Sequence, residues 1–233
     1  MFIGVVGATG NIGQRVLTEA VARGHHVTAF TRDAGQITTS QPNVNWRSLD
    51  IFDSAAIAAA LPGMDVLISC YQPGNAAADF DDTVARSIAD PTVYASAARS
   101  LLDALHTHPR TRLIVVGGAG SLEYEPGRIT ADDDRRLADT LDGLGLPREY
   151  AAAVRGHRAA LDILRTSNRL WTYLSPAELI AAGERTGRYR VGGDQPIRDT
   201  DGNSRISIED AAVALLDEVE LPRFIQRRFT IGY

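Results

Sequence analysis

The sequence of 233 residues predicts an α/β fold built around a doubly wound parallel sheet, and three observations support this prediction. Short runs of consecutive apolar residues alternate with segments of helical spacing, a glycine-rich turn directly follows the first run, and the composition changes after residue 174. Strands of a parallel sheet are covered on both faces, so they are apolar throughout instead of alternating. Helices are therefore expected on both sides of the sheet.

Each strand and helix can be placed from these signals, beginning with a strand at residues 2–6. A helix follows at residues 11–23, because its apolar residues recur at helical spacing and Gly24 stops it. Further strands are expected at residues 26–30, 44–46, 66–69, 113–116 and 171–174. Further helices are expected near residues 54–60, 92–106 and 150–165.

The chain after residue 174 has a different character, since residues 175–203 are rich in Gly, Arg and Asp and lack a helical period. This stretch is expected to form a small lobe in which residues 189–191 pair with residues 196–198. Ser207 should then cap a helix, and a last strand is expected at residues 229–231. A second irregular stretch, residues 117–148, is a candidate wall or lid of a site, because long loops in compact domains are usually functional or mobile.

The composition excludes several classes of function. The 24 basic residues stand against 29 acidic ones, so the net charge of −5 offers nucleic acid no general attraction. No stretch has the roughly 18 apolar residues of a membrane helix, and the protein is expected to be cytoplasmic. A single cysteine and histidines without ligand spacing predict no metal site. The sequence contains no lysine, which excludes Schiff-base catalysis and any proton relay that needs an ammonium group.

The glycine-rich turn GATGNIG, residues 7–13, opens the first helix. Gly7 permits a tight turn, Gly10 lets the backbone approach a pyrophosphate, and Gly13 lets the helix pack closely on the sheet. The helix N-terminus adds N–H donors and a positive dipole end. The turn predicts a dinucleotide site with contacts from Gly7, Thr9, Gly10, Asn11, Ile12 and Gly13. The predicted fold is thus a Rossmann-type domain spanning residues 1–233, to which residues 175–206 contribute a small C-terminal substrate lobe.

The end of the second strand indicates which dinucleotide is preferred. Sites specific for NAD place a carboxylate there for the ribose 2′-hydroxyl, whereas NADP sites use an arginine. Neither Phe30 nor Thr31 can replace the carboxylate, and Arg32 is placed to meet a 2′-phosphate. The expected cofactor is therefore NADP(H) in preference to NAD(H). Asp33 leaves an alternative open, because it can pair with Arg32 or accept from the ribose itself.

Several segments together resemble the atypical short-chain dehydrogenases/reductases, within them the NmrA-like and NADH-flavin reductase group that is related to biliverdin reductase B. The resemblance covers essentially the whole chain. It rests on the glycine turn, on Asp50-Ile51, and on the segments VVGGAGS (115–121), WTYLSP (171–176), GERTG (183–187), GGD (192–194) and RIS (205–207).

The resemblance implies further site residues. Asp50 would bond the adenine amino group while Ile51 packs on the ring, although Asp50 could equally be a turn residue. Ser121 would be the hydroxyl nearest the nicotinamide and a candidate catalytic residue, with a turn cap as the alternative. The remaining implied cofactor contacts are Ser69, Cys70, Tyr71, Gly117, Gly118 and Pro176.

Typical members of the superfamily use a tyrosine followed four residues later by a lysine that lowers its pKa. The matching tyrosine is Tyr150, the second candidate catalytic residue, but Val154 occupies the lysine position. His157 lies roughly 10 Å from Tyr150 along the helix, too far for a direct hydrogen bond, and is expected to be an ordinary helix residue. Tyr124, Tyr150 and residues 175–190 are expected to shape an apolar slot.

Three functions remain open. The first is an NAD(P)H-dependent oxidoreductase that transfers hydride to a flavin, quinone or similar small planar acceptor without a Tyr/Lys relay. The second is a redox sensor of the NmrA-like type that binds the dinucleotide without turning it over. The third is a specialised reductase or isomerase acting on a small metabolite. The oligomeric state is left open between a monomer and a homodimer.

Overall fold

The computed structural model describes residues 1–38, 41–75 and 77–233. Within these residues, eight strands form one sheet in the order β10-β12-β8-β5-β4-β1-β2-β3. Every neighbouring pair is parallel except β10 with β12, which confirms the predicted doubly wound α/β fold. The strands are β1 Phe2–Val6, β2 His26–Thr31, β3 Val44–Ser48, β4 Val66–Ser69, β5 Arg112–Val116, β8 Trp171–Ser175, β10 Arg190–Gly192 and β12 Arg227–Gly232.

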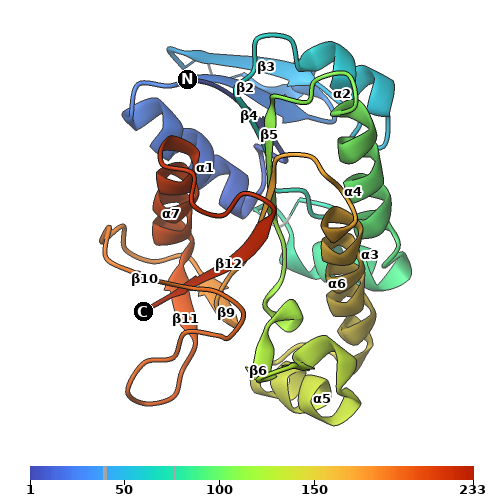
Figure 1. The fold of residues 1–233 in the computed structure, drawn as a ribbon, viewed down its shortest axis with the longest axis vertical. Helices are drawn as coiled ribbons and strands as arrows, with labels where there is room; N and C mark the ends of the chain where they lie inside the picture. The colour runs from blue at the N-terminus through green and yellow to red at the C-terminus, as the bar shows by residue number, and fades with distance from the viewer. Residues whose placement is uncertain (39–40, 76) are drawn as a thin grey trace.

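Helices cover both faces of the sheet (Figure 1). On one face lie α1 (Asn11–Ala22) and α7 (Ile208–Glu220), which pack against each other and against the sheet. On the other lie α2 (Ser54–Ala60), α4 (Val93–Ala104) and α6 (Ala151–Arg165). Because apolar side chains leave both faces of β1, β4 and β5, the sheet separates two hydrophobic cores.

The strand order reverses direction between β1 and β4. From β1 the chain moves outward through β2 to β3, then returns to β4 on the other side of β1 and moves outward again through β5 to β8. Ligands of open α/β sheets bind in the crevice beyond the carboxyl ends of the strands at such a reversal. The segments that follow β1 and β4 are the glycine turn and Cys70-Tyr71, so the fold brings the two predicted cofactor segments together.

Two expectations for the irregular stretches are wrong. Residues 189–191 were expected to pair with residues 196–198, but residues 190–192 pair antiparallel with β12, whose edge is otherwise open. Residues 117–148 are not irregular, since they contain a hairpin of β6 (Glu123–Glu125) and β7 (Arg128–Ile129) and the helix α5 (Asp134–Gly143). Asp133 caps α5 by accepting from the backbone N–H of Arg136 at 2.9 Å.

Further elements complete the molecule. Helix α3 (Phe80–Ala89) follows the β4 segment, and β9 (Leu179–Ala181) pairs in parallel with β11 (Arg205–Ser207) in a separate small sheet. The predicted cap of α7 is confirmed, because the Ser207 hydroxyl accepts from the backbone N–H of Asp210 at 3.0 Å. Single 3₁₀ turns lie at Ala34–Gln36, Ala119–Ser121, Thr130–Asp132 and Arg148–Tyr150. None of the described helices is long and apolar enough to cross a membrane.

Candidate functional site

The glycine turn after β1 has a geometry that excludes side chains. Gly7 adopts a φ of 72°, and the backbone N–H of Gly10 donates to its carbonyl oxygen at 3.0 Å. A methyl group on Gly13 would overlap that same carbonyl, so α1 can pack on the turn only with glycine at this position. These contacts hold the start of α1 directly beyond the carboxyl end of β1.

The N-terminus of α1 is suited to an anionic group. Gly10 precedes the first helical residue and has no side chain with which to cap the helix, and the first turn carries no acidic residue. The positive end of the helix dipole is therefore not neutralised by a neighbouring carboxylate. Gly10 leaves space in which the backbone can approach a ligand closely, and the helix N-terminus has no capping side chain. Both properties suit the pyrophosphate of a dinucleotide.

A cavity of about 490 Å³ extends from this turn across the ends of β4, β5 and β8. Most of the predicted contact residues line it together, although they come from five separate segments of the chain. These residues are Gly7, Thr9, Gly10, Asn11, Ile12, Cys70, Tyr71, Gly117, Gly118, Tyr150 and Pro176. A methyl group on Gly117 would overlap the ring of Tyr173, so the cavity floor at the end of β5 is bare backbone.

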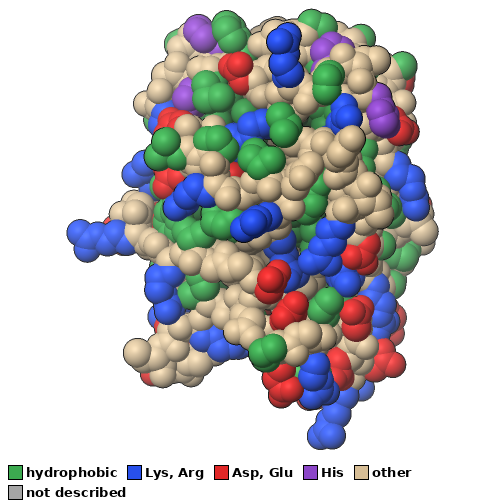
Figure 2. Space-filling view, in the orientation of Figure 1, with side chains coloured by type: hydrophobic (Ala, Val, Ile, Leu, Met, Phe, Trp, Pro, Cys, Tyr) green, Lys and Arg blue, Asp and Glu red, His purple; other side chains and the backbone are tan. Residues whose placement is uncertain are grey.

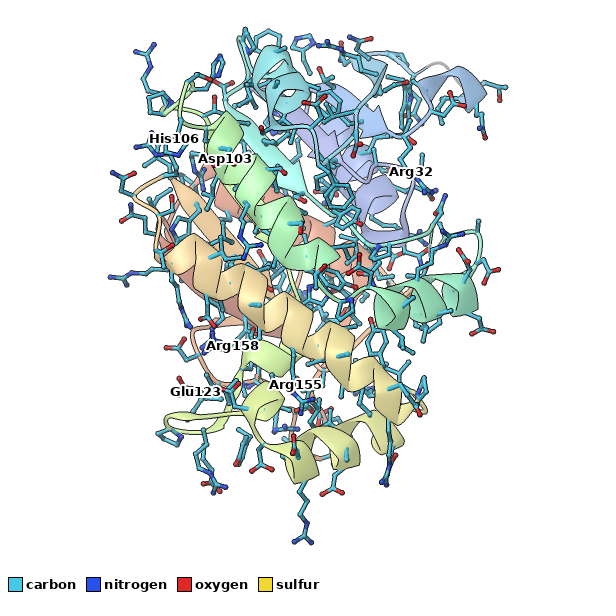
Figure 3. All side chains as sticks on the ribbon, turned by 90° about the vertical axis from the view of Figure 1, so that its right-hand side faces the viewer. Arg32, Asp103, His106, Glu123, Arg155 and Arg158 are labelled. Atoms are coloured by element: carbon cyan, nitrogen blue, oxygen red, sulfur yellow. The ribbon has the colours of Figure 1, made fainter. Side chains whose placement is uncertain are left out.

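The other predicted cofactor residues lie outside the cavity wall. Gly13 and Ser69 are part of the supporting turn and strand, and Ile51 is buried in the core. Asp50 accepts a hydrogen bond from the backbone N–H of Phe52 at 2.9 Å, so its turn role is realised. Arg32 lies at the end of β2 and donates to the carbonyl oxygen of Gly74 at 3.5 Å (Figure 3).

Arg32 and Asp50 nevertheless lie close to Tyr71, which lines the cavity. Both charges act on the hydroxyl of Tyr71, whose pKa burial raises to about 12. Asp33 accepts from the backbone N–H of Gly35 at 2.9 Å and from the Gln36 amide, so its carboxylate has local partners instead of Arg32. The guanidinium of Arg32 is therefore not paired with Asp33, and it lies close enough to Tyr71 of the cavity lining to act on its pKa.

Ser121 does not reach the cavity, and its expected catalytic role is corrected. Its buried hydroxyl donates to the carbonyl oxygen of Gly118 at 3.0 Å and lies 2.8 Å from the hydroxyl of Ser175. The backbone oxygen of Ser121 also accepts from the buried guanidinium of Arg228. Ser121 thus joins the ends of β5 and β8, because every polar atom of its side chain is already used within the fold.

Tyr124 also lies outside the cavity, contrary to expectation. Its hydroxyl donates to Asp133 at 2.7 Å, and its ring lies under the guanidinium groups of Arg128 and Arg136, at 4.9 and 5.6 Å from the ring centroid. Figure 2 shows acidic and basic side chains intermixed over β6 and α5 in this part of the surface. Tyr124 therefore anchors the hairpin to α5.

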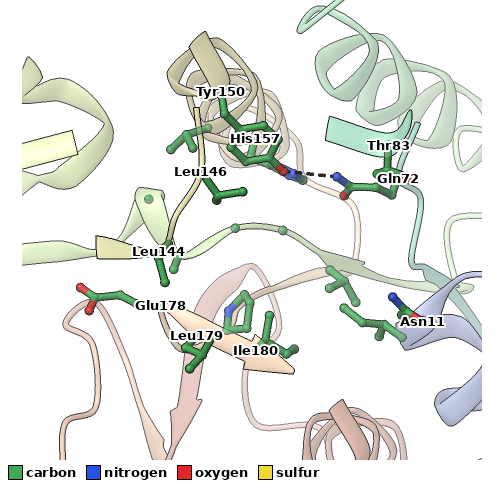
Figure 4. Close-up of a pocket in the computed structure, with 18 of the residues that line it drawn as sticks. Asn11, Gln72, Thr83, Leu144, Leu146, Tyr150, His157, Glu178, Leu179 and Ile180 are labelled. Carbon is green, nitrogen blue, oxygen red and sulfur yellow. Dashed lines mark hydrogen bonds between the residues drawn. The ribbon is translucent and has the colours of Figure 1, made fainter. Parts of the chain in front are cut away.

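The end of the cavity far from the glycine turn is apolar and is built from α5, β9 and the start of α6 (Figure 4). The helix α5 contributes residues here that were not predicted, since its range was expected to be irregular. Arg155 of α6 holds α5 in place by donating to Asp134 at 2.5 Å and to the Ala131 carbonyl oxygen at 3.2 Å (Figure 3). The apolar lining consists of Leu137, Leu141, Leu144, Leu146, Val154, Leu179 and Ile180.

His157 lines the cavity, although the sequence suggested an ordinary helix position. Its ring lies tilted against that of Tyr94, with 3.8 Å between centroids and 35° between the ring planes, and it borders Gly118. Burial lowers the pKa of His157 to about 4, so the imidazole is neutral at pH 7. The signal in the sequence was weak, because the partner ring comes from a different helix.

Val154 stands four residues after Tyr150, at the position that a lysine holds in a Tyr/Lys pair. Val154 fills the space above Gly120, where an added methyl group would overlap its γ-carbon. Without an ammonium group nearby, burial raises the pKa of Tyr150 above its ordinary value. The phenol is thus protonated at neutral pH. In the described part of the chain, no three His, Cys, Asp or Glu side chains gather as metal ligands would.

Residues 7–219 match a family of NAD(P)H-binding domains. The chain belongs to this NAD(P)H-binding family. The match confirms the resemblance to the atypical short-chain dehydrogenases/reductases and includes both the glycine turn and the cavity lining. For a member of this family, the cradle formed by Gly7, Gly10 and the start of α1 fits the cofactor, because Gly7 allows the tight turn and Gly10 leaves the uncapped helix N-terminus bare for a pyrophosphate.

Relatives of this NAD(P)H-binding protein have full-length similarity to it. The uncharacterized protein YwnB of Bacillus subtilis is 34% identical over 235 residues, which cover 99% of this chain and 98% of YwnB. A solved structure from Burkholderia pseudomallei, provisionally named an exported protein, is 40% identical with a TM-score of 0.81 and full coverage of both chains. A Streptococcus pneumoniae structure, provisionally named an NADH-flavin reductase, is 28% identical with a TM-score of 0.80. The match covers 100% of this chain and 99% of the Streptococcus pneumoniae chain.

Proposed function

We propose that the protein is an NAD(P)H-dependent oxidoreductase that transfers hydride to a planar acceptor such as a flavin or a quinone. One observation carries the proposal: a single cavity of about 490 Å³ is lined both by the dinucleotide turn and by a group of apolar side chains from other segments. A site that only bound a dinucleotide would not need the second, leucine-lined end. The provisional name of the Streptococcus pneumoniae relative points to the same chemistry.

The residues divide into two groups with different tasks. Gly7 to Gly13 and the start of α1 would hold the pyrophosphate, and Arg32 would bind a 2′-phosphate, which favours NADP(H) over NAD(H). The bare backbone of Gly117 and Gly118 would let the nicotinamide lie against the end of β5. When bound there, the reduced cofactor supplies the hydride.

The apolar end would orient the acceptor and exclude water. Leu144 and Leu146, which follow α5, lie across the cavity from Leu179 and Ile180 of β9, an arrangement that suits two faces of a flat ring (Figure 4). Flavins and quinones accept hydride at an electrophilic ring position, and the proton can follow from solvent. The missing lysine beside Tyr150 is therefore compatible with this reaction, whereas it argues against the acid–base chemistry of typical family relatives.

The test is oxidation of NADPH by the purified protein with riboflavin, FMN or a small quinone, followed at 340 nm, with melting temperatures measured on the same samples. Turnover with stabilisation by NADPH is expected. Stabilisation by the cofactor without turnover of any planar acceptor would contradict the oxidoreductase proposal. That result would favour a redox sensor or an enzyme acting on a different metabolite.

A further inference from the structure

A buried chain of hydrogen bonds runs from α3 to the cavity wall. The hydroxyl of Ser87 donates to the carbonyl oxygen of Thr83 at 2.7 Å. The hydroxyl of Tyr94, on α4, donates to the Ser87 oxygen at 3.0 Å. Both Ser87 and Tyr94 are buried, so these bonds are shielded from competing water.

This pattern fixes which way the Gln72 amide points. A serine hydroxyl has one hydrogen, and Ser87 has already given it to Thr83. The Gln72 atom that faces Ser87 must therefore be the NH₂ group, which lies 3.5 Å from the Ser87 oxygen. The same nitrogen lies 3.4 Å from the hydroxyl oxygen of Tyr150, to which it must also donate (Figure 4).

Tyr150 is the last residue in this series of hydrogen bonds, and its hydroxyl acts as an acceptor in the bond from Gln72. Its hydroxyl oxygen receives the Gln72 hydrogen, and its own hydrogen has no acceptor among residues 1–38, 41–75 and 77–233. Tyr150 lines the cavity, so the free hydrogen is available to a bound molecule. Both bonds of Gln72 are long, which is common where a site tightens only around its ligand.

The electrostatics of this part of the cavity favour an uncharged ligand. His157 and Tyr71 line it and Tyr94 packs behind them, and all three are neutral between pH 5 and 8, because burial lowers the histidine pKa and raises those of the tyrosines. Among the described lining residues there is no arginine, and the carboxylate of Glu178 is paired with Arg198 at 2.6 Å. An anionic ring substituent would find no counter-charge here.

We infer that Gln72, held by Ser87, is a positioning residue that keeps the Tyr150 hydrogen directed at a carbonyl oxygen of an uncharged planar ligand. A quinone oxygen is such an acceptor, and it becomes more basic as hydride reaches the ring. The inference rests on the proposed function for the ligand class. In this arrangement the Gln72 amide takes the place of the missing ammonium group. It is a neutral donor, so it orients the phenol without ionising it.

The test compares two ligands that share a dimethyl-substituted two-ring skeleton and differ in the two carbonyl oxygens. They are 2,3-dimethyl-1,4-naphthoquinone and 2,3-dimethylnaphthalene, each bound to the protein saturated with NADP⁺. Calorimetry gives the ratio of their dissociation constants, which isolates the contribution of the carbonyl oxygens. Loss of the single donor in Tyr150→Phe is expected to reduce the preference for the quinone by about 3–10-fold. Gln41→Glu, at an exposed position, is the matched control for the Gln72→Glu variant described next and should leave the ratio unchanged.

Gln72→Glu tests which group donates in the hydrogen bond between residue 72 and Tyr150. At pH 8 its carboxylate would accept the Tyr150 hydrogen, so the preference for the quinone should fall as in Tyr150→Phe. At pH 5 a fraction of the carboxyl groups is protonated and can donate again, so part of the preference should return, whereas the wild-type ratio should be the same at both pH values. A purely structural role of Gln72 would not produce this pH dependence.

Melting temperatures of all variants show whether each is folded, and Gln72→Met provides a second variant that removes the donor without adding charge. The inference is overturned if folded Gln72→Met or Gln72→Glu keeps the wild-type ratio at pH 8. If the ratios change as expected but NADPH is not oxidised with the quinone, the oxidoreductase proposal fails while the role of Gln72 stands.

Discussion

Gly7 and Cys70 meet where the sheet reverses direction: a methyl group on Gly7 would lie 2.7 Å from the carbonyl oxygen of Cys70. The turn after β1 and the segment after β4 are thus in backbone contact. Gly7 also has a φ of 72°, a conformation that a residue with a Cβ rarely adopts. Two separate physical reasons therefore require glycine at this position.

Gly7→Ala and Gly24→Ala separate these two reasons. Gly24 has nearly the same φ, 78°, but nothing lies within 4 Å of an added methyl group. Gly24→Ala should lose about 1 kcal/mol of unfolding free energy from backbone strain alone and bind NADPH normally. Gly7→Ala should be less stable than Gly24→Ala and bind NADPH about 10-fold more weakly, since the turn must shift. Equal NADPH affinity of the two variants, measured by calorimetry, would contradict the proposed cradle.

Arg32→Ala tests the preference for NADP(H). Loss of a charge-assisted bond to a 2′-phosphate should weaken NADPH binding by about 10–100-fold, while NADH binding should change little. Arg110→Ala is the control for lost positive charge, because Arg110 is exposed and precedes the amino end of β5, whereas Arg32 follows the carboxyl end of β2. Calorimetric dissociation constants for both dinucleotides decide the question. A parallel loss of NADH affinity in Arg32→Ala would mean that Arg32 does not read the phosphate.

His157 should make stability depend on pH. Its pKa of about 4 lies below the ordinary value of 6.5, so between these values the unfolded chain binds a proton that the folded protein does not. Stability is therefore fully present above pH 6.5 and falls as the pH drops towards 4, by about 2 kcal/mol between pH 7 and 5. Urea unfolding should show a smaller fall for His157→Gln than for wild type. His106→Gln, at an exposed position, controls for the loss of a surface histidine.

Glu218 on α7 connects that helix to the start of β5 through a buried ion pair. Its fully buried carboxylate accepts from Arg112 at 3.1 Å and from the backbone N–H groups of Arg223 and Phe224. Glu218→Ala should cost about 3–5 kcal/mol of unfolding free energy, because Arg112 and two backbone donors lose their partner inside the protein. Asp142→Ala, which breaks an exposed pair with Arg148, should have a much smaller effect. Similar melting temperatures for the two variants would refute this account.

Much of the architecture was predictable because its signals are local. The helix at residues 54–60 and the strand at residues 66–69 have the predicted bounds, since a capping Asp53 and a continuous apolar run identify them without reference to the rest of the chain. The helix α5 was missed because only Leu137 and Leu141 are buried in it. Its cap at Asp133 and the four-residue spacing of those leucines are the signals that could have revealed it.

The sequence by itself determined the doubly wound sheet, the place of the dinucleotide turn and the absence of a lysine relay, because residue spacing and residue type decide these properties. The tertiary structure alone decided that Ser121 is bonded within the fold and that Tyr124 anchors a hairpin. It also brought Gln72 to Tyr150, which lies 78 residues further along the chain. A hydrogen bond has a direction that depends on every partner of its donor and acceptor, and those partners meet only when separate helices pack together.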